Sequence, residues 1–184
     1  MRKIPTIFKR DETRGGKIKN EYTINPAELQ FATATEKIDG TNVRVTVRNK
    51  TIVRVEKRAN PSKLQKAKGI IEPWYVDASE SSEDKWIMDA VKNTDYSNII
   101  DGEWSGEAVG TNIQGNPLKL DKNKVIFFTL GQCPSFDNVP VTFDALKEWL
   151  PKQKSKVGID CGIEGIVWHY NDGRMAKIKT KDFI

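Results

Sequence analysis

Residues 35–42 read TEKIDGTN and stand between two segments with the alternating pattern of β-strands. Residues 31–36 alternate apolar and small polar side chains before this stretch, and residues 43–47 alternate valine with polar residues after it. A lysine, Lys37, therefore lies at the end of one predicted strand, and Gly40 lies three residues later, before the next strand. Such a tight connection presents the lysine toward a cleft, while the glycine lets the backbone approach a ligand closely.

The same alternation continues outward from this stretch. Asn49-Lys50 joins residues 43–47 to a strand at 51–55, and Asn171-Asp172-Gly173 is a strong hairpin signal between the last two predicted strands. The remaining predicted strands cover residues 99–104, 125–130, 163–169 and 175–180. Helices are predicted at 84–92 and 143–150, a short basic helix at 61–69, and a loop at 72–82. The pattern predicts an α+β fold of mostly antiparallel sheets flanked by a few helices.

Length and composition limit the class of protein. The chain has 184 residues, of which 38% are hydrophobic, and this suits one domain over residues 1–184, with residues 1–30 as a basic N-terminal extension. Apolar runs are short, and no apolar stretch follows the N-terminal residues, so neither a membrane span nor a secretory signal is predicted. Cys133 and Cys161 form no metal-binding motif with the single histidine, and a cytoplasmic setting is expected.

Charge is unevenly distributed along the chain. Residues 1–71 contain 17 basic and seven acidic side chains, whereas residues 72–108 contain two basic and ten acidic ones. This asymmetry predicts one surface suited to a polyanion and one that is not, although two solvated surfaces without a function would give the same count. The segments Arg2–Lys19 and Arg44–Lys68 are the candidates for holding phosphates.

Several later segments place charged or aromatic side chains in predicted strands. Glu103 lies within one, the pair Phe127-Phe128 in another, and Glu164 begins a third. Lys177 and Lys179 project from the same face of the last strand, where two cations repel each other unless an anion lies between them. Each residue taken singly is more often structural, but the set and its order are hard to obtain by chance.

This set resembles the covalent nucleotidyltransferase superfamily of polynucleotide ligases and mRNA-capping enzymes. Lys37–Gly40 is similar to the K-x-D-G nucleophile motif, and Asn42 with the preceding Glu36 favours the ATP-dependent RNA ligase branch. The other family motifs are matched, in order, by Arg58, Glu103, Phe127 or Phe128, Glu164-Gly165 and Lys177-Ile178-Lys179. The resemblance implies an ATP-grasp-like adenylyltransferase (ligase catalytic) domain, with no C-terminal OB domain expected.

The resemblance also implies a reaction in three steps. Lys37 attacks the α-phosphate of ATP and releases pyrophosphate, the AMP passes to an RNA 5′-phosphate, and an RNA 3′-hydroxyl displaces the AMP. An ordinary lysine has a pKa of about 10.4, so nearby cations and partial burial are needed to yield the neutral amine. Lys177 and Lys179 are expected to supply that charge and to hold the α-phosphate.

The remaining roles follow from the same resemblance. Mg²⁺ or Mn²⁺ is expected near Asp39, Glu103 and Glu164, largely through waters. Nucleotide contacts are expected from Glu36, Gly40, Asn42, Arg58, Glu103, Glu164 and Phe128, which is favoured over Phe127 for stacking on adenine. Lys37, Lys177, Lys179 and Asp39 form the expected catalytic set.

Two other functions remain open at this stage. The first is that of another covalent nucleotidyltransferase, either a DNA ligase or a capping guanylyltransferase. The second is that of a non-catalytic nucleic-acid-binding module. The expected partner is RNA with 5′-phosphate and 3′-hydroxyl ends, with a further protein chain as a possible aid to substrate binding.

Overall fold

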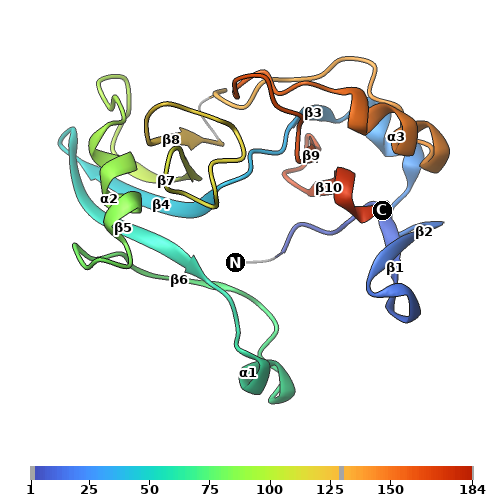
Figure 1. The fold of residues 1–184 in the computed structure, drawn as a ribbon, viewed down its shortest axis with the longest axis horizontal. Coiled ribbons are helices and arrows are strands. Elements are labelled where there is room, and N and C mark those ends of the chain that lie inside the picture. The colour runs from blue at the N-terminus through green and yellow to red at the C-terminus, as the bar shows by residue number, and fades with distance from the viewer. Residues whose placement is uncertain (1–2, 129–130, 184) are drawn as a thin grey trace. The chain divides into compact units, whose positions relative to one another are not determined.

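Figure 1 shows the computed structural model, which describes residues 3–128 and 131–183. The chain divides into two units, each with its own hydrophobic core. Unit 1 is built on Asp39–Gln132, and unit 2 on Ile4–Ile38 and Cys133–Ile184. The chain passes from unit 2 to unit 1 between Ile38 and Asp39, within the K-x-D-G stretch. The single domain predicted over residues 1–184 therefore has two centres of packing.

Unit 1 contains a five-stranded antiparallel sheet in the order β6-β5-β4-β7-β8. Its strands are β4 (Thr41–Arg48), β5 (Thr51–Ala59), β6 (Trp74–Asp77), β7 (Gly102–Val109) and β8 (Lys124–Phe127). Two helices belong to this unit, α1 (Lys63–Ala67) and α2 (Lys85–Lys92).

The turn between β4 and β5 matches the hairpin predicted from the sequence. Asn49 and Lys50 have φ values of 51° and 57°, so both occupy the left-handed region that two-residue hairpin turns require. The Asp101 carboxylate accepts hydrogen bonds from the N–H groups of Asn49 at 2.9 Å and Lys50 at 3.5 Å. This hairpin fixes the register of β4, which carries the residues that follow Gly40.

The two faces of the unit 1 sheet differ in character because alternate residues of a strand point to opposite faces. On one face, valines of β4 and β5, with Phe127 of β8, form a core with α2, which contributes Ile87, Ala90 and Val91. The spacing of these three α2 residues places them on one side of the helix. The opposite face carries Asn42 and Arg44, and the predicted nucleotide contacts Asn42, Arg58 and Glu103 share this polar face.

Unit 2 contains a three-stranded antiparallel sheet, in the order β10-β9-β3, and a separate two-stranded ribbon of β1 and β2. Its elements are β1 (Phe8–Asp11), β2 (Lys17–Tyr22), β3 (Thr33–Glu36), α3 (Phe143–Trp149), β9 (Gly165–His169) and β10 (Met175–Lys179). Short 3₁₀ helices lie at Glu12–Arg14, Pro26–Phe31, Leu150–Lys152 and Thr180–Asp182.

The hairpin predicted at Asn171-Asp172-Gly173 joins β9 to β10. Gly173 has a φ of 84°, and the Tyr170 N–H donates to the Arg174 carbonyl at 3.0 Å. The register that follows pairs Lys177 with Val167 and Lys179 with Gly165. The predicted hairpin is confirmed.

The N-terminal residues are an integral part of unit 2. Ile7 and Phe8 are fully buried, and Ile18 is nearly so, in a core that also contains Trp168 and Leu146. Residues 1–30 were expected to be a basic extension, and the structure corrects this for the described part. The cause is that a few apolar side chains, including Ile7, Phe8 and Ile18, lie among the basic ones that dominated the composition.

Most predicted elements are present, and the α+β class with antiparallel sheets is confirmed. The strand expected at 31–36 begins at residue 33, and the one expected at 99–104 covers 102–109. The strand expected to reach residue 130 is described only to Phe127, since residues 129–130 lie outside the described part. Sequence analysis missed β1 and β2, and it assigned β6 to a loop. Among the described residues, no helix has the length and apolar character needed to cross a membrane.

Substitution of Phe127 by alanine tests the assignment of the two sheet faces. Phe127 is fully buried, so Phe127→Ala is expected to lower the free energy of unfolding by about 3–5 kcal/mol. Phe128 is only half-buried, and Phe128→Ala is expected to cost less than about 1 kcal/mol. Urea unfolding of both variants measures this difference, and equal losses would contradict the assignment.

Candidate active site

Three neighbouring strands bring Lys37, Glu164 and Lys179 to the same end of the unit 2 sheet. Lys37 directly follows β3, and its N–H donates to the Gly165 carbonyl at 2.9 Å. Glu164 immediately precedes β9, and Lys179 ends β10 opposite Gly165. The backbone pairing therefore places all three residues at the same end of the sheet.

Glu164 makes an ion pair with each of these lysines. The Lys37 Nζ lies 2.6 Å from Glu164 Oε2, and the Lys179 Nζ lies 2.6 Å from Glu164 Oε1. The Glu164 side chain is only 8% exposed. Burial by itself raises the pKa of this carboxyl, but the charge of Lys37 and the hydrogen bonds from Lys179 and Lys37 hold its pKa below the ordinary value. The cluster thus combines one carboxylate with two ammonium groups.

Gly165 is required by the close packing of β9 on β10. A Cβ at this position would lie 2.0 Å from the Ile178 carbonyl oxygen, which is backbone and has no room to move. A side chain here would separate the strands that bring Glu164 to Lys179. The Glu-Gly pair read in the sequence therefore has a packing cause in addition to any role in chemistry.

Lys177 and Lys179 share one face of β10, as the alternation predicted. Ala176 and Ile178 point the other way and are fully buried. The Lys177 N–H donates to the Pro5 carbonyl at 2.9 Å, and the Lys177 carbonyl accepts from the Ile7 N–H at 2.9 Å. The N-terminal segment therefore lies along β10 and holds this strand from its outer side.

Glu36 has a different role from the nucleotide contact expected from the sequence. Its side chain is 2% exposed, and its carboxylate accepts hydrogen bonds from the Ser155 hydroxyl at 2.5 Å and the Lys156 N–H at 2.8 Å. Alternation along β3 directs Glu36 to the core face, away from the face of Thr35. Glu36 thus anchors the loop around Ser155, and we correct its assignment to a structural one.

On the polar face of unit 1, Arg44 is held by a buried carboxylate. Its Nε and Nη2 donate to the two oxygens of Glu56 at 2.6 and 2.8 Å, and Glu56 is 1% exposed. The hydrogen bonds from Arg44 hold the pKa of Glu56 below its usual value against the opposing effect of burial. The Arg44 guanidinium also lies 4.4 Å from the ring centre of Tyr75. Neither Arg44 nor Glu56 was singled out from the sequence.

Tyr75 connects Arg44 to the predicted site residue Asn42. The Tyr75 hydroxyl donates to Asn42 Oδ1 at 2.8 Å and lies 3.2 Å from Ser105 Oγ. The Asn42 amide in turn donates to the Gly106 carbonyl at 3.3 Å. Tyr75 was missed because residues 72–82 were assigned to a loop. Its signal was the run Trp74-Tyr75-Val76, which has the aromatic and β-branched composition of a strand.

Glu103 and Arg58 also lie on the unit 1 sheet but are less constrained. Glu103 is 51% exposed and lies 3.4 Å from the Arg44 guanidinium. Arg58 is exposed, lies opposite Tyr75 in the register, and makes no ion pair with the residues that the structure describes. Both side chains are accessible to a ligand at this face.

The structure separates the two aromatic candidates. Phe127 is fully buried and contacts Tyr96 with the ring centres 5.9 Å apart, so it is not available for stacking on a base. Phe128 is half-buried, and its N–H donates to the Ser105 carbonyl at 3.0 Å. Phe128 therefore remains the candidate.

Gly40 is packed against β7 at the start of the polar face. A Cβ at residue 40 would lie 2.4 Å from the Ala108 carbonyl oxygen, so only glycine fits. Asp39, where the chain enters unit 1 from unit 2, is half-buried. The requirement for glycine at residue 40 arises from sheet packing. The sequence analysis had attributed this requirement to the close approach of a ligand.

The predicted metal ligands are chemically suitable but do not form a cluster on their own. Carboxylate oxygens suit Mg²⁺ and Mn²⁺, and Glu103 is accessible. Within the described ranges, no group of three or more His, Cys, Asp or Glu side chains is placed to hold a metal ion. Asp39 and Glu103 belong to unit 1 and Glu164 to unit 2, so this metal set stays a prediction.

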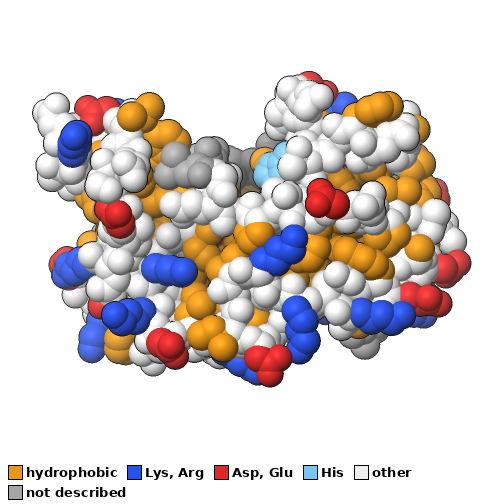
Figure 2. Space-filling model, turned by 90° about the horizontal axis from the view of Figure 1, so that it is seen from above, with side chains coloured by type: hydrophobic (Ala, Val, Ile, Leu, Met, Phe, Trp, Pro, Cys, Tyr) orange, Lys and Arg blue, Asp and Glu red, His pale blue; other side chains and the backbone are white. Residues whose placement is uncertain are grey.

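Basic and acidic segments pair with each other within unit 1. Arg54 contacts Asp77 at 2.6 Å, and Lys57 contacts Glu83 and Asp84 at 3.0 and 2.5 Å. On the face of the molecule drawn in Figure 2, Lys and Arg side chains are interspersed with Asp and Glu side chains. Part of the charge asymmetry seen along the sequence is therefore neutralised by pairing in the fold.

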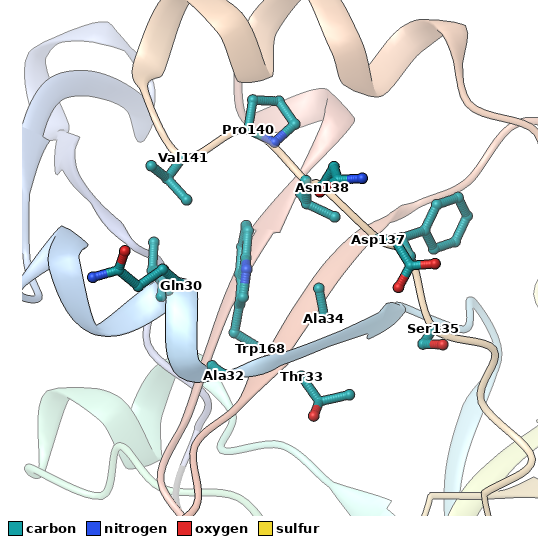
Figure 3. Close-up of a pocket in the computed structure, with 13 residues that line it drawn as sticks. Gln30, Ala32, Thr33, Ala34, Ser135, Asp137, Asn138, Pro140, Val141 and Trp168 are labelled. Atoms are coloured by element: carbon teal, nitrogen blue, oxygen red, sulfur yellow. The ribbon is translucent and has the colours of Figure 1, made fainter.

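A pocket of about 590 Å³ in unit 2 lies apart from these residues (Figure 3). It lies between the start of β3 and the segment 135–141, with Trp168 at its wall and Gln30, Thr33 and Asp137 among its polar residues. None of the predicted site residues lines it. The pocket therefore gives no support to a nucleotide site at this position.

The fold of this chain is similar to that of solved RNA ligase structures. Two of them are variants of Naegleria gruberi RNA ligase. One, with ATP and Mn, shows a TM-score of 0.52 at 15% identity over 97% of this chain and 60% of the other. The second, with AMP and Mn, shows a TM-score of 0.50 at 16% identity over 86% of this chain and 52% of the other. This chain thus spans about half to three fifths of those proteins, and at this identity the likeness concerns the fold alone.

A search of curated proteins finds no match. The model of the RNA ligase 1 family, in contrast, matches residues 81–183, which is more than half of the chain. The matched region contains Glu103, Phe128, Glu164, Lys177 and Lys179. The chain belongs to the RNA ligase 1 family.

Proposed function

We propose that this protein is an ATP-dependent RNA ligase that forms a covalent lysyl-AMP on Lys37. The observation that carries the proposal is the contact of Glu164 with both Lys37 and Lys179 at 2.6 Å, in a chain of the RNA ligase 1 family. The similar Naegleria gruberi structures with ATP or AMP and Mn support the choice of nucleotide and divalent metal.

In the first step, the Lys37 amine forms a bond to the α-phosphorus of ATP as the bond to pyrophosphate breaks. An ammonium group has no lone pair for attack, so the ion pair between Lys37 and Glu164 must open and Lys37 must release a proton. Lys179 then remains beside Glu164 as a fixed positive charge, and Lys177 lies on the same strand face. These two lysines hold the α-phosphate and stabilise the negative charge that develops on it.

The polar face of unit 1 holds the rest of the nucleotide in this proposal. Phe128 stacks on the adenine, while Asn42 and Arg58 contact the ribose or the phosphates. Asn42 is oriented for this task by the Tyr75 hydroxyl, so Tyr75 is a positioning residue. Asp39, Glu103 and Glu164 are the residues that would hold a divalent metal, which would supply positive charge to the phosphates.

In the later steps, a 5′-phosphate oxygen of RNA takes the AMP from Lys37, and the lysine is regenerated. A 3′-hydroxyl of RNA then forms the phosphodiester bond and releases AMP. The RNA therefore needs a 5′-phosphate and a 3′-hydroxyl, and a further protein chain that aids RNA binding is compatible with this proposal. A cytoplasmic setting, as expected from the sequence, is proposed with it.

Two alternatives have distinct signatures. A capping guanylyltransferase would be labelled by GTP rather than ATP, and a DNA ligase would seal DNA in preference to RNA. A non-catalytic binding module would take no label at all. Membership of the RNA ligase 1 family favours the proposed ATP-dependent RNA ligase over these alternatives.

Labelling with α-labelled ATP and a divalent metal tests the proposal. Wild-type protein is expected to retain label after denaturation, whereas Lys37→Ala is expected to retain none, because the attacking nitrogen is absent. Lys181→Ala removes an exposed lysine outside the cluster and is the matched control, expected to be labelled like wild type. Folded wild-type protein that takes no label with several metals would overturn the ATP ligase proposal.

Tyr75→Phe tests the positioning of Asn42. Loss of one hydrogen bond, worth about 0.5–1.5 kcal/mol, is expected to slow adenylylation at subsaturating ATP by about 2- to 10-fold, chiefly through KM. Tyr22→Phe removes a comparable hydrogen bond, to the Val141 carbonyl at 2.8 Å in unit 2, and is expected to leave the rate unchanged. Equal effects of the two substitutions would contradict the assignment.

Acid titration tests the charge state of Glu164. The pKa of Glu164 is lowered in the folded protein, so its ion pairs stabilise the fold above about pH 4.5 and lose this effect as the pH falls through the folded-state pKa. Glu164→Gln is therefore expected to be less stable than wild type at pH 7, with a difference that shrinks below about pH 4.5. Urea unfolding between pH 3 and 7 measures it, with Glu148→Gln, at an exposed position of α3, as the control. A difference independent of pH would contradict the ion-pair assignment.

A further inference from the structure

Residues 62–72 form a projection from the unit 1 sheet, which we call the basic arm. The arm leaves the sheet after β5, contains α1, and returns at β6 (Figure 1). Pro61 and Pro73 are buried at its two ends, whereas α1 has no buried residue. The arm thus has a fixed base and a surface that no other described part of unit 1 covers.

Local hydrogen bonds hold α1 in shape. Ser62 accepts from the Gln65 N–H at 3.2 Å, and the Gln65 side chain accepts from the Ser62 N–H at 2.9 Å, which is a capping box. At the other end Gly69 has a φ of 84°, and the Ile70 N–H donates to the Gln65 carbonyl at 3.0 Å. A helix of five residues is not stable in water by itself, so these two caps are what maintain it.

The arm carries positive charge that the fold does not neutralise. Lys63, Lys66 and Lys68 are exposed and make no ion pair with the described residues. The only acid of the arm is Glu72, which accepts a hydrogen bond from the Lys3 N–H at 3.1 Å. Elsewhere in unit 1 the acidic segment pairs with the basic one, as for Arg54 and Lys57. Within the basic segment Arg44–Lys68, the arm contributes three of the side chains that have no ion pair with the described residues, and Arg58 is another.

The base of the arm adjoins the proposed site. Arg58 and Tyr75 face each other in the register of β5 and β6, one pair before Ala59 and Trp74 at the end of the ladder. Arg58 is a proposed phosphate contact, and Tyr75 holds Asn42. A chain of phosphates lying on the arm would therefore lead directly onto the polar face of the sheet.

We propose that the basic arm binds the phosphate backbone of the substrate RNA through Lys63, Lys66 and Lys68. This inference rests on the proposed function for the identity of the polyanion. Lys63 and Lys66 lie one helical turn apart, and Lys68 follows at the C-cap, so the three ammonium groups cover the short helix. The arm contains no aromatic side chain on which a base could stack, so the binding is independent of sequence.

The test compares RNA binding by the wild-type chain and by Lys63→Gln/Lys66→Gln/Lys68→Gln. Glutamine keeps the helix propensity of lysine, so the fold of α1 is preserved. The control, Lys122→Gln/Lys147→Gln/Lys152→Gln, removes three exposed lysines without ion pairs from outside the arm. The probe is a 5′-phosphorylated single-stranded RNA, measured by fluorescence anisotropy between 50 and 200 mM salt, beside labelling of each protein by ATP.

Each phosphate contact contributes about 0.7 to the slope of log affinity against log salt. Loss of three contacts is therefore expected to make the slope of log affinity against log salt smaller by about 2 in the arm variant than in wild type. As a result, the ratio of wild-type to variant affinity is expected to fall roughly 20-fold between 50 and 200 mM salt. Labelling by ATP is expected to be unchanged in both variants, and the control is expected to bind RNA like wild type.

Two results would overturn the arm proposal without touching the proposed function. One is unchanged RNA affinity and slope in the arm variant while labelling is intact. The other is an equal loss in the control, which would indicate a general charge effect. The arm also offers an apolar surface, because Leu64 and Ile71 are 67% and 61% exposed. Binding of the arm to anionic phospholipid vesicles without binding to RNA would therefore also overturn the arm proposal. Failure of the wild type to take label would instead concern the proposed function, and the binding comparison would still test the arm.

Discussion

The bridge that Glu164 makes between Lys37 and Lys179 is the interaction on which the proposed chemistry depends. Three charged groups share one end of a three-stranded sheet, and the carboxylate is almost entirely withdrawn from water. Removing such a carboxylate from water is unfavourable unless charged partners surround it, so the two lysines and the glutamate are meaningful only as a set. The close approach of β9 and β10 at Gly165 makes the set possible. In the proposed reaction, Lys37 would be the nucleophile, and it lies in an ion pair beside Lys179, whose charge would hold the phosphate.

The polar face of unit 1 depends on a second buried carboxylate. Glu56 fixes the Arg44 guanidinium with two hydrogen bonds, and this guanidinium covers the ring of Tyr75. Tyr75 in turn fixes the amide of Asn42. The strand β6, short and at the edge of the sheet, therefore contributes to the proposed nucleotide site through a side chain that acts on another side chain. Such an arrangement keeps the contacts rigid, and rigidity limits the entropy lost when a nucleotide binds.

The pairing of oppositely charged segments explains how a chain with a basic first third avoids a uniformly basic surface. Salt bridges at exposed positions contribute little stability, but they cancel the field that a polyanion would otherwise meet. Cancellation is incomplete at the basic arm, where caps rather than packing maintain a helix. Positive charge concentrated on the arm, next to Arg58, would give direction to the proposed interaction with RNA, which net charge alone would leave diffuse.

Sequence by itself determined the strands around residues 35–48, both hairpin turns, the shared face of Lys177 and Lys179, and the family motifs, because each depends on local periodicity or on spacing. It did not determine the roles of Glu36, Tyr75 and Phe127. Glu36 adjoins Lys37 in the chain, yet alternation turns it into the core of unit 2, and the partner that satisfies it is Ser155, far away in the sequence. Tyr75 acquires its role only when β6 pairs with β5, and β1 and β2 become part of a core only when Phe8 meets residues near the C-terminus, including Phe183. Long-range contacts decide these features, since burial and hydrogen-bond partners are properties of the packed fold and leave no periodic signal in the sequence.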